Sequence, residues 1–353
     1  MKIHLKTLIY SAILLSSSYT VDAQSTDPTA EHIATVIDAK PIERVHPKYP
    51  RSAARNGQEG WARVSFVIDK QGNVIDPIIE DTSGLNVFNK EALKAVKEWK
   101  YSPAMQNGEA IEQCQMQVQM DFVMEKQKGV TRKFMTRYRD ITDAIANKDL
   151  AQAASMLEDL GESQLWNHSE STYFYLADAV YAQAVDDKER ELRSVNRALH
   201  GAKHELKSNS HLYLLERQFI LNLNSQRYLN ALESFASIQK TDNNQALLAK
   251  LQPYAEQVSQ LVKGEELLQL EASIQDGGQF YHKLSRNKFS LAIEQGSLDE
   301  VEIRCANKRS RFTAEADNEW HIPQAWGQCT IFVTGTPDTQ FYVIELGAYV
   351  GEI

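Results

Sequence analysis

Polar and apolar side chains alternate along most of residues 112–124. Because successive side chains of a strand point to opposite faces, this period of two predicts an amphipathic strand. The apolar face would carry Cys114, Met116, Val118, Met120, Phe122 and Met124, and the polar face Gln113, Gln115, Gln117 and Gln119. We therefore expect one face in a core and the other in contact with water.

Two further strands are expected earlier in the same region. The runs at residues 61–68 and 74–79 are rich in β-branched and aromatic residues. They flank a turn at residues 69–73, in which Gly72 and Asn73 tolerate the positive φ that a tight hairpin needs. These two strands are expected to pair antiparallel.

A helix is expected between this hairpin and the alternating strand. Asn86 is a candidate N-cap for it. Apolar residues then recur at intervals of three and four and form one stripe: Phe88, Ala92, Ala95 and Trp99. The helix should end before Pro103, because the residue before a proline is pushed out of the helical region.

Over residues 42–126 the expected order is a short helix, two strands, a helix and a third strand, with a Tyr-Pro pair near the start and a Trp-x-Tyr-x-Pro motif after the second helix. This arrangement resembles the C-terminal domain of TonB-family energy transducers. The positions that carry the resemblance are Tyr49, Pro50, Ala54, Glu59, Gly60, Val64, Phe66, Gly72, Val74, Phe88, Ala92, Ala95, Trp99, Tyr101 and Pro103. Each is a weak signal alone, but their joint order and spacing is a strong one.

The resemblance implies a binding module that captures a short extended segment of an outer-membrane receptor, the TonB box, and adds it as a strand beside its own last strand. A strand edge offers unpaired N–H and C=O groups, so backbone pairing gives affinity with little demand on sequence. The candidate partner-binding residues are Gln113, Gln115, Gln117, Gln119 and Asp121 on that strand, and His46, Pro47, Lys48, Tyr49 and Pro50, which the resemblance places against the same receptor segment. In the alternatives, the last strand only completes the sheet, or pairs with a second copy to form a homodimer.

Residues 130–263 have the pattern of amphipathic helices. Three triplets share offsets of three and seven residues, and each lies on one helical face: Leu150/Ala153/Leu157, Leu192/Val195/Leu199 and Tyr228/Ala231/Phe235. The third looks like the second helix of a tetratricopeptide repeat. The sequence predicts a degenerate array of such helical hairpins, whose concave surface would bind another component of a transport system. The alternative is a plain helical bundle that acts as a spacer.

Short strands return after Gly264 and one more short helical stretch. The expected strands are residues 288–293, 301–306, 309–314, 329–333 and 341–345, separated by turn residues. They predict a small antiparallel β-sandwich over residues 264–353. The 353 residues are enough for two or three domains. The predicted fold is therefore multidomain α+β, with a three-stranded sheet module, a central helical array and this sandwich.

Residues 1–23 have the marks of a secretory signal peptide: Lys2 and Lys6 precede a short apolar run, and small residues lead to Ala23. Cleavage after Ala23 would leave a linker, residues 24–41, and a periplasmic protein. The alternative is an uncleaved anchor in the inner membrane. The chain departs here from the transducers it resembles, which carry a long proline-rich span across the periplasm. The expected linker of about twenty residues would reach only about 70 Å even when fully extended.

Cysteine positions predict one disulfide. Cys305 and Cys329 both fall in expected strands of the last domain, and an exported protein is free to oxidise them. The alternative is a pair of buried thiols. Cys114 is left over, and its place in the alternating strand predicts a buried free thiol.

The sequence holds no Gly-x-Ser-x-Gly elbow, glycine-rich phosphate loop, His-Glu-x-x-His or Cys-x-x-Cys motif, so neither an enzyme nor a cofactor is expected. His200 and His204 are four residues apart on an expected helix, but two imidazoles without a third ligand are usually a solvated face rather than a metal site. Trp320 and Trp326 either line a sugar or peptide groove or, more commonly, pack beneath a sandwich edge.

The formal net charge of −9, without a basic stripe, argues against nucleic acid and anionic membranes as partners. Two functions remain. In the first, the protein binds TonB-dependent receptors and is associated with energised transport. In the second, it is a periplasmic adaptor or assembly scaffold without a part in energy transduction. The Tyr49-Pro50 pair and the alternating strand favour the first.

Overall fold

The computed structural model describes residues 36–124, 129–163, 167–242, 244–274, 278–314 and 318–351, without the side chains of residues 163 and 201–205. Val36–Ile353 clusters as one compact unit. The expected signal peptide and most of the expected linker lie outside the described residues. Within the described ranges, no helix is both long and apolar enough to cross a membrane.

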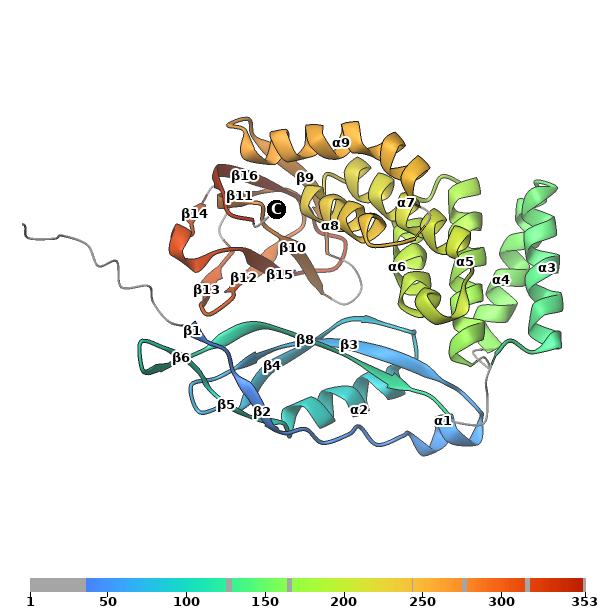
Figure 1. The fold of residues 1–353 in the computed structure, drawn as a ribbon, viewed down its shortest axis with the longest axis horizontal. Helices are drawn as coiled ribbons and strands as arrows, with labels where there is room; N and C mark the ends of the chain where they lie inside the picture. The colour runs from blue at the N-terminus through green and yellow to red at the C-terminus, as the bar shows by residue number, and fades with distance from the viewer. Residues whose placement is uncertain are drawn as a thin grey trace, which may run out of the picture. The chain divides into compact units, whose positions relative to one another are not determined.

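The sheet module, residues 36–124, is built on a three-stranded antiparallel sheet in the order β4-β3-β8, as far as the described residues go. Its strands are β3 (Gly60–Ile68), β4 (Val74–Thr82) and β8 (Gln113–Phe122). A short helix, α1 (Arg51–Arg55), precedes β3, and α2 (Asn86–Lys97) covers one face of the sheet (Figure 1). The order of these five elements is the one expected from the sequence.

The core of the sheet module lies between α2 and the sheet. The predicted apolar stripe is buried at every position, although its last member follows the end of α2 at Lys97: Phe88, Ala92, Ala95 and Trp99. Phe88 stacks on Phe122 of β8 with ring centroids 4.6 Å apart. The predicted cap is wrong, because Leu85 holds the N-cap position without a side-chain hydrogen bond and Asn86 is the first helical residue.

Five very short strands were not expected. They are β1 (Val36–Ile37), β2 (Lys40–Glu43), β5 (Lys100–Ser102), β6 (Ala104–Gln106) and β7 (Glu109–Ile111). β2 pairs with β5, and β1 pairs with β6, so the end of the expected linker belongs to the module. Strands of two to four residues are too short to show a period in the sequence.

The turn between β3 and β4 requires glycine at position 72. Its φ is +81°, and its C=O accepts from the N–H of Tyr101 at 2.9 Å. A Cβ at this position would lie only 1.8 Å from the Tyr101 carbonyl oxygen. A side chain here would therefore strain the turn and push it away from β5.

A β-bulge near the start of β8 changes which way its side chains point. Phe66 pairs with Met116 but Ile68 pairs with Gln113, so β8 carries one extra residue. Cys114 is a buried free cysteine, as expected, but it does not join the core cluster of the module. The charged groups that act on its thiol include Arg304 and Arg309, far along the chain, and burial raises its pKa to about 12. The predicted common face for Cys114 and Met116 is therefore wrong.

The helical array, residues 132–263, contains three helical hairpins and a final helix within the described part of the chain. The pairs are α3 (Arg132–Ala146) with α4 (Leu150–Ser163), α5 (His168–Ala184) with α6 (Lys188–Glu205), and α7 (Ser208–Asn224) with α8 (Tyr228–Gln239). The helix α9 (Gln245–Lys263) follows. The three predicted triplets lie on α4, α6 and α8, and their central residues Ala153, Val195 and Ala231 are fully buried.

The same turn closes each of these hairpins. Lys148, Asp186 and Gln226 have φ of +61°, +57° and +57°. In each case the next residue donates its N–H at 2.9 Å to a carbonyl near the end of the first helix: Asp149 to Ala144, Asp187 to Ala182 and Arg227 to Asn222. The three turns thus share a backbone conformation although their side chains differ.

The C-terminal β domain, residues 268–351, has two four-stranded antiparallel sheets among its described residues, in the orders β10-β15-β12-β13 and β14-β11-β16-β9. The strands are β9 (Leu268–Ser273), β10 (Gln279–Lys283), β11 (Arg286–Gln295), β12 (Leu298–Cys305), β13 (Arg309–Thr313), β14 (Glu319–His321), β15 (Cys329–Gly335) and β16 (Gln340–Tyr349). β9, β10 and β14 were not expected. The short helical stretch expected after Gly264 is wrong, because β9 is the first element there.

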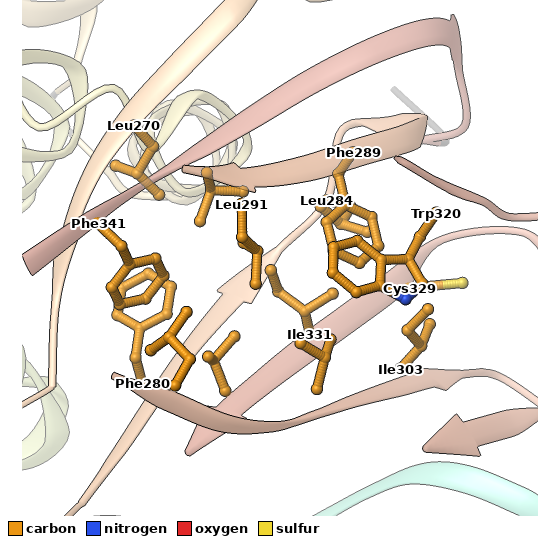
Figure 2. Close-up of a cluster of buried hydrophobic side chains, with 14 of the residues drawn as sticks. Leu270, Phe280, Leu284, Phe289, Leu291, Ile303, Trp320, Cys329, Ile331 and Phe341 are labelled. Atoms are coloured by element: carbon orange, nitrogen blue, oxygen red, sulfur yellow. The ribbon is translucent and has the colours of Figure 1, made fainter. Parts of the chain in front are cut away.

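One cluster of buried side chains from both sheets forms the core of the β domain (Figure 2). Phe289 and Trp320 stack with centroids 5.0 Å apart, and Phe280 meets the ring of Phe341 edge-on at 5.3 Å. Trp320 is therefore a core residue and not part of an open groove.

Arg286 joins the β domain to the end of α9. Its guanidinium is fully buried and donates to the carbonyls of Leu261 at 2.9 Å, Val262 at 3.2 Å and Glu266. The last carbonyls of a helix lack helical N–H partners, so the bonds to Leu261 and Val262 help to satisfy them. The backbone N–H of Arg286 is itself held by buried Glu345 at 2.9 Å. The array and the β domain thus share a buried polar junction.

In the structure a disulfide joins Cys305 to Cys329, which face each other in the register of β12 and β15. The two cysteines are 24 residues apart. We expect the disulfide in the exported protein, and Cys305→Ser/Cys329→Ser should lower the free energy of unfolding by about 3 kcal/mol. Alkylation of the denatured, unreduced chain followed by mass spectrometry should modify Cys114 alone. Modification of three cysteines before reduction would contradict the disulfide.

Candidate functional site

The outer edge of β8 is the candidate partner-binding site, and the backbone directions along it follow from β3. Trp61 of β3 turns both backbone groups toward β4: its N–H donates to Ser83 Oγ and its C=O accepts from Ser83 N–H, both at 3.0 Å. Directions alternate along an antiparallel strand, so Ala62 turns its groups toward β8. Met120, which pairs with Ala62, directs its backbone N–H and C=O groups toward β3.

The register between β3 and β8 is continuous from Phe66↔Met116 to Gly60↔Phe122. The same alternation therefore directs the N–H and C=O groups of Gln117, Gln119 and Asp121 away from β3. Among the described residues, no strand pairs with this side of β8. These three predicted residues thus form an open row of backbone donors and acceptors.

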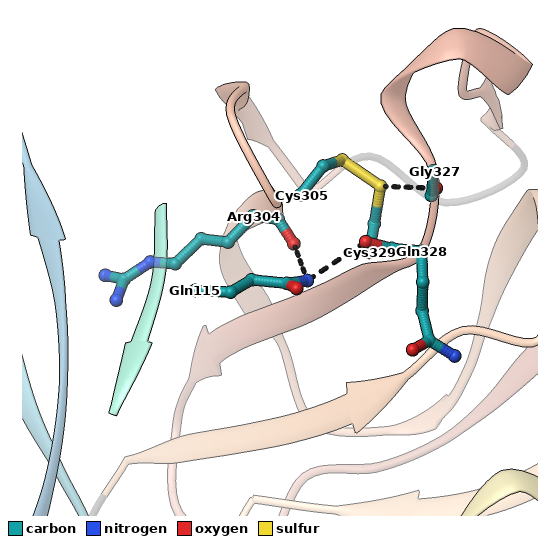
Figure 3. The surroundings of a disulfide bond; sticks show 6 residues. All are labelled: Gln115, Arg304, Cys305, Gly327, Gln328 and Cys329. Carbon is teal, nitrogen blue, oxygen red and sulfur yellow. Dashed lines mark hydrogen bonds between the residues drawn. A yellow bond between two sulfur atoms is a disulfide. The ribbon is translucent and has the colours of Figure 1, made fainter. Parts of the chain in front are cut away.

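The start of the same edge is already occupied by the β domain (Figure 3). The N–H of Cys114 donates to the carbonyl of Ala306 at 2.9 Å. The side-chain amide of Gln115 donates to the carbonyls of Arg304 at 3.1 Å and Gln328 at 3.0 Å. Gln115 thus contacts another part of the same chain, where we had expected water.

The other predicted glutamines bond inside the sheet module. The side chain of Gln113 accepts from the N–H of Ala39 at 2.7 Å. The amide of Gln117 donates to Glu80, and that of Gln119 donates to Asp121 at 2.8 Å. The side chains of Gln113 and Gln117 therefore bond to other segments of the module, and that of Gln119 bonds within β8, while the backbone groups of Gln117 and Gln119 face outward.

The predicted segment His46–Pro50 approaches the far end of β8. Tyr49 packs its ring edge-on against Phe122, with centroids 6.0 Å apart, and its hydroxyl donates to the carbonyl of Gln58 at 2.6 Å. Burial, with the charge of Glu59, raises the pKa of Tyr49 to about 12. His46 and Lys48 are exposed, and Pro47 and Pro50 are half-buried. The structure thus brings Tyr49 to β8 and leaves His46 and Lys48 open to solvent.

Sequence reasoning missed a polar cluster on the face of the sheet opposite α2. Arg63 lies 3.6 Å from both Glu80 and Asp81, and its guanidinium donates to His200 Nε2 of α6 at 2.9 Å. Arg197 of α6 adds an ion pair with Asp81 at 3.2 Å. The contacts from Arg63 to His200 and from Arg197 to Asp81 join residues more than a hundred positions apart, so no local pattern could reveal them.

This cluster lines an open cavity of about 1350 Å³. Side chains from the sheet module, from α6 to α8 and from β10 and β15 surround it, among them Arg63, Arg197, Tyr281 and Phe332. Basic and acidic side chains both line its walls, so its charge does not select one class of ligand.

His200 is engaged as a hydrogen-bond acceptor. The centroid of its ring lies 4.4 Å from that of Trp61. Because the Arg63 guanidinium can only donate, Nε2 of His200 must accept the hydrogen bond and carries no proton. The side chain of His204 lies outside the described residues. Within the described residues, no group of three or more His, Cys, Asp and Glu side chains suits a metal ion.

Comparison with known proteins concerns the sheet module. Residues 45–124 match the family model for the Gram-negative bacterial TonB protein C-terminal. Protein TonB of Vibrio cholerae serotype O1 is 34% identical over 98 residues, which cover 25% of this chain and 39% of that protein. Protein TonB of Pseudomonas aeruginosa is 30% identical over 74 residues, which cover 21% of this chain and 22% of that protein. The chain thus spans well under half the length of these curated relatives.

Solved structures are also similar to part of this chain. The solution NMR structure of the Pseudomonas aeruginosa TonB CTD is 28% identical, with a TM-score of 0.24, and covers 26% of this chain and 91% of that one.

We expect the protonation of His200 to lower the free energy of unfolding in mild acid. Burial, and then the charge of Arg63, lowers its pKa to about 4, against the attraction of Asp81 and Asp121; His168 also lowers it. The folded state thus binds fewer protons than the unfolded state between pH 6.5 and 4, so the free energy of unfolding drops as pH falls through this window. At pH 5 this amounts to roughly 2 kcal/mol.

Thermal unfolding of the full chain at pH 7 and pH 5 would measure the effect. His200→Gln keeps an acceptor for Arg63 and cannot titrate, so it should lose less stability between these pH values than the wild type. The exposed His46→Gln is the matched control and should behave as the wild type does. Equal losses in all three proteins would contradict the assignment.

Proposed function

Because residues 45–124 are a TonB C-terminal domain, we propose that this chain is a periplasmic protein that binds outer-membrane TonB-dependent receptors through the edge of β8. The bound segment is the TonB box, added as a further strand of the sheet. The protein is then associated with energised transport across the outer membrane.

The open row at Gln117, Gln119 and Asp121 is the observation that supports this proposal. Outward N–H and C=O groups at alternate residues are what an added strand pairs with. Tyr49 packs against Phe122 at the end of the same strand, and this contact supports a role for the half-buried Tyr-Pro pair beside the incoming segment. Exposed His46 and Lys48 lie beside it.

The helical array has a separate role in the proposal, as a tetratricopeptide-like docking unit for another component of the transport system. Its support is the identical turn at Lys148, Asp186 and Gln226, because a recurring turn is typical of repeats that stack hairpin on hairpin. In the proposal the β domain is a small sandwich, which the single core between its two sheets supports.

Receptor binding is tested at Gln117. Gln117→Pro removes one outward N–H, so affinity for a receptor peptide should fall at least tenfold. Gln117→Ala is the matched control, because it loses the side chain and keeps the N–H, and its affinity should stay within about twofold. Fluorescence anisotropy of labelled peptides from receptor N-termini, titrated with the full chain, would measure both.

Folding of the Gln117→Pro variant is checked by its circular dichroism and thermal unfolding. Equal peptide affinity for a folded Gln117→Pro protein and the wild type would exclude this edge. If no receptor peptide binds the wild type at millimolar concentration, the adaptor or scaffold function becomes the better explanation.

Export is tested at the start of the chain. We expect the protein recovered from the periplasm to begin at Gln24, because cleavage after Ala23 fits a short apolar run followed by small residues. Intact-mass measurement of the purified protein reads this directly. A mass that includes Met1–Ala23, with the protein in the inner-membrane fraction, would instead support an uncleaved anchor.

A further inference from the structure

The β domain contacts the sheet module at the strand edge that the proposed function requires. The contact begins with a backbone bond, Cys114 N–H to Ala306 C=O at 2.9 Å, which is the type of bond that an added strand makes. The next residue, Gln115, reaches the carbonyls of Arg304 and Gln328 with its side chain (Figure 3). Part of the edge is therefore paired within the chain.

The disulfide fixes the two carbonyls that hold Gln115. Arg304 and Gln328 directly precede Cys305 and Cys329, and the bridge ties their strands together at this point (Figure 3). One amide group can thus bond both carbonyls at once. The docking position on the β domain is preformed.

Ion pairs beside this position hold the two parts together. Arg309 of β13 bonds Asp76 of β4 and lies 3.3 Å from Glu112, just before β8. Arg311 lies 3.1 Å from the same Asp76. Burial alone would raise the pKa of Asp76, but the hydrogen bond from Arg309 and the charge of Arg311 outweigh it and lower the pKa. Asp76 therefore stays charged and paired at neutral pH.

We propose that the β domain competes with the receptor segment for the edge of β8. While the β domain is docked, Ala306 occupies the hydrogen-bonding position at Cys114 that an added strand would take. Only the edge from Gln117 to Asp121 is then free. When it separates, the whole edge from Gln113 to Asp121 accepts a longer strand. The proposal rests on the proposed function, and it makes the β domain a regulator of how much receptor backbone can be bound.

The test compares two peptides from one receptor segment. A five-residue peptide pairs only with Gln117 to Asp121, and a nine-residue peptide extends to Gln113. Both are titrated into the full chain and into Arg309→Ala/Arg311→Ala. This variant removes the ion pairs to Asp76 and Glu112, together with those to Glu300 and Glu302 inside the β domain, and changes no residue of the edge. The nine-residue peptide should bind the variant about fivefold more tightly than the wild type, because the docked state is less populated. The five-residue peptide should bind both equally.

Lys288→Ala is the matched control, because Lys288 pairs with Glu319 at 3.5 Å inside the β domain. It should leave both affinities unchanged. A second readout needs no peptide: hydrogen exchange at the Cys114 amide should be slow in the wild type and faster in the double variant. Unchanged exchange would overturn the proposal.

The two failures are distinguishable. Both peptides could bind the wild type while the double variant shows a higher affinity for neither peptide, or the same increase for both. Either result would exclude the competition and leave receptor binding supported. If neither peptide binds any variant, the proposed function fails, and the competition fails with it.

Discussion

The backbone groups at the edge of a sheet must find partners, because burying an unpaired N–H or C=O costs roughly 1–3 kcal/mol. β8 meets this constraint in two ways. Near its start, the N–H of Cys114 is satisfied inside the chain by Ala306. Further along, Gln117, Gln119 and Asp121 turn their groups outward, where water or another chain must satisfy them. The position of the β domain therefore decides how much of the edge is offered to a partner.

Elements with a long, local pattern could be predicted from the sequence. The stripe at α2 and the central residues of the triplets on α4, α6 and α8 are buried, because one face of a helix must enter a core and its spacing is visible in the sequence. The pairing of Cys305 with Cys329, which the structure also has, could be predicted because both cysteines lie in expected strands of one domain. In each case the residues that carry the signal lie in one continuous stretch or in one domain.

The rest depends on tertiary contacts that leave no local mark. The alternation at residues 112–124 runs on through the β-bulge, so nothing in it shows that Cys114 leaves the face of Met116. The bonds from Gln115 to Arg304 and from Arg63 to His200 join residues 189 and 137 positions apart. The resemblance to TonB could indicate the strand edge, but it could not reveal what lies against that edge in this chain.

The recurring turn of the helical array has a consequence for how such a chain can grow or shrink. Lys148, Asp186 and Gln226 adopt one backbone conformation with three different side chains. A duplication or deletion that begins at one of these turns and ends at the next would join matching backbone geometry on both sides. The array can therefore change in length by whole hairpins while the modules at its two ends keep their folds. Related proteins with more or fewer hairpins between a similar sheet module and β domain would be products of that route.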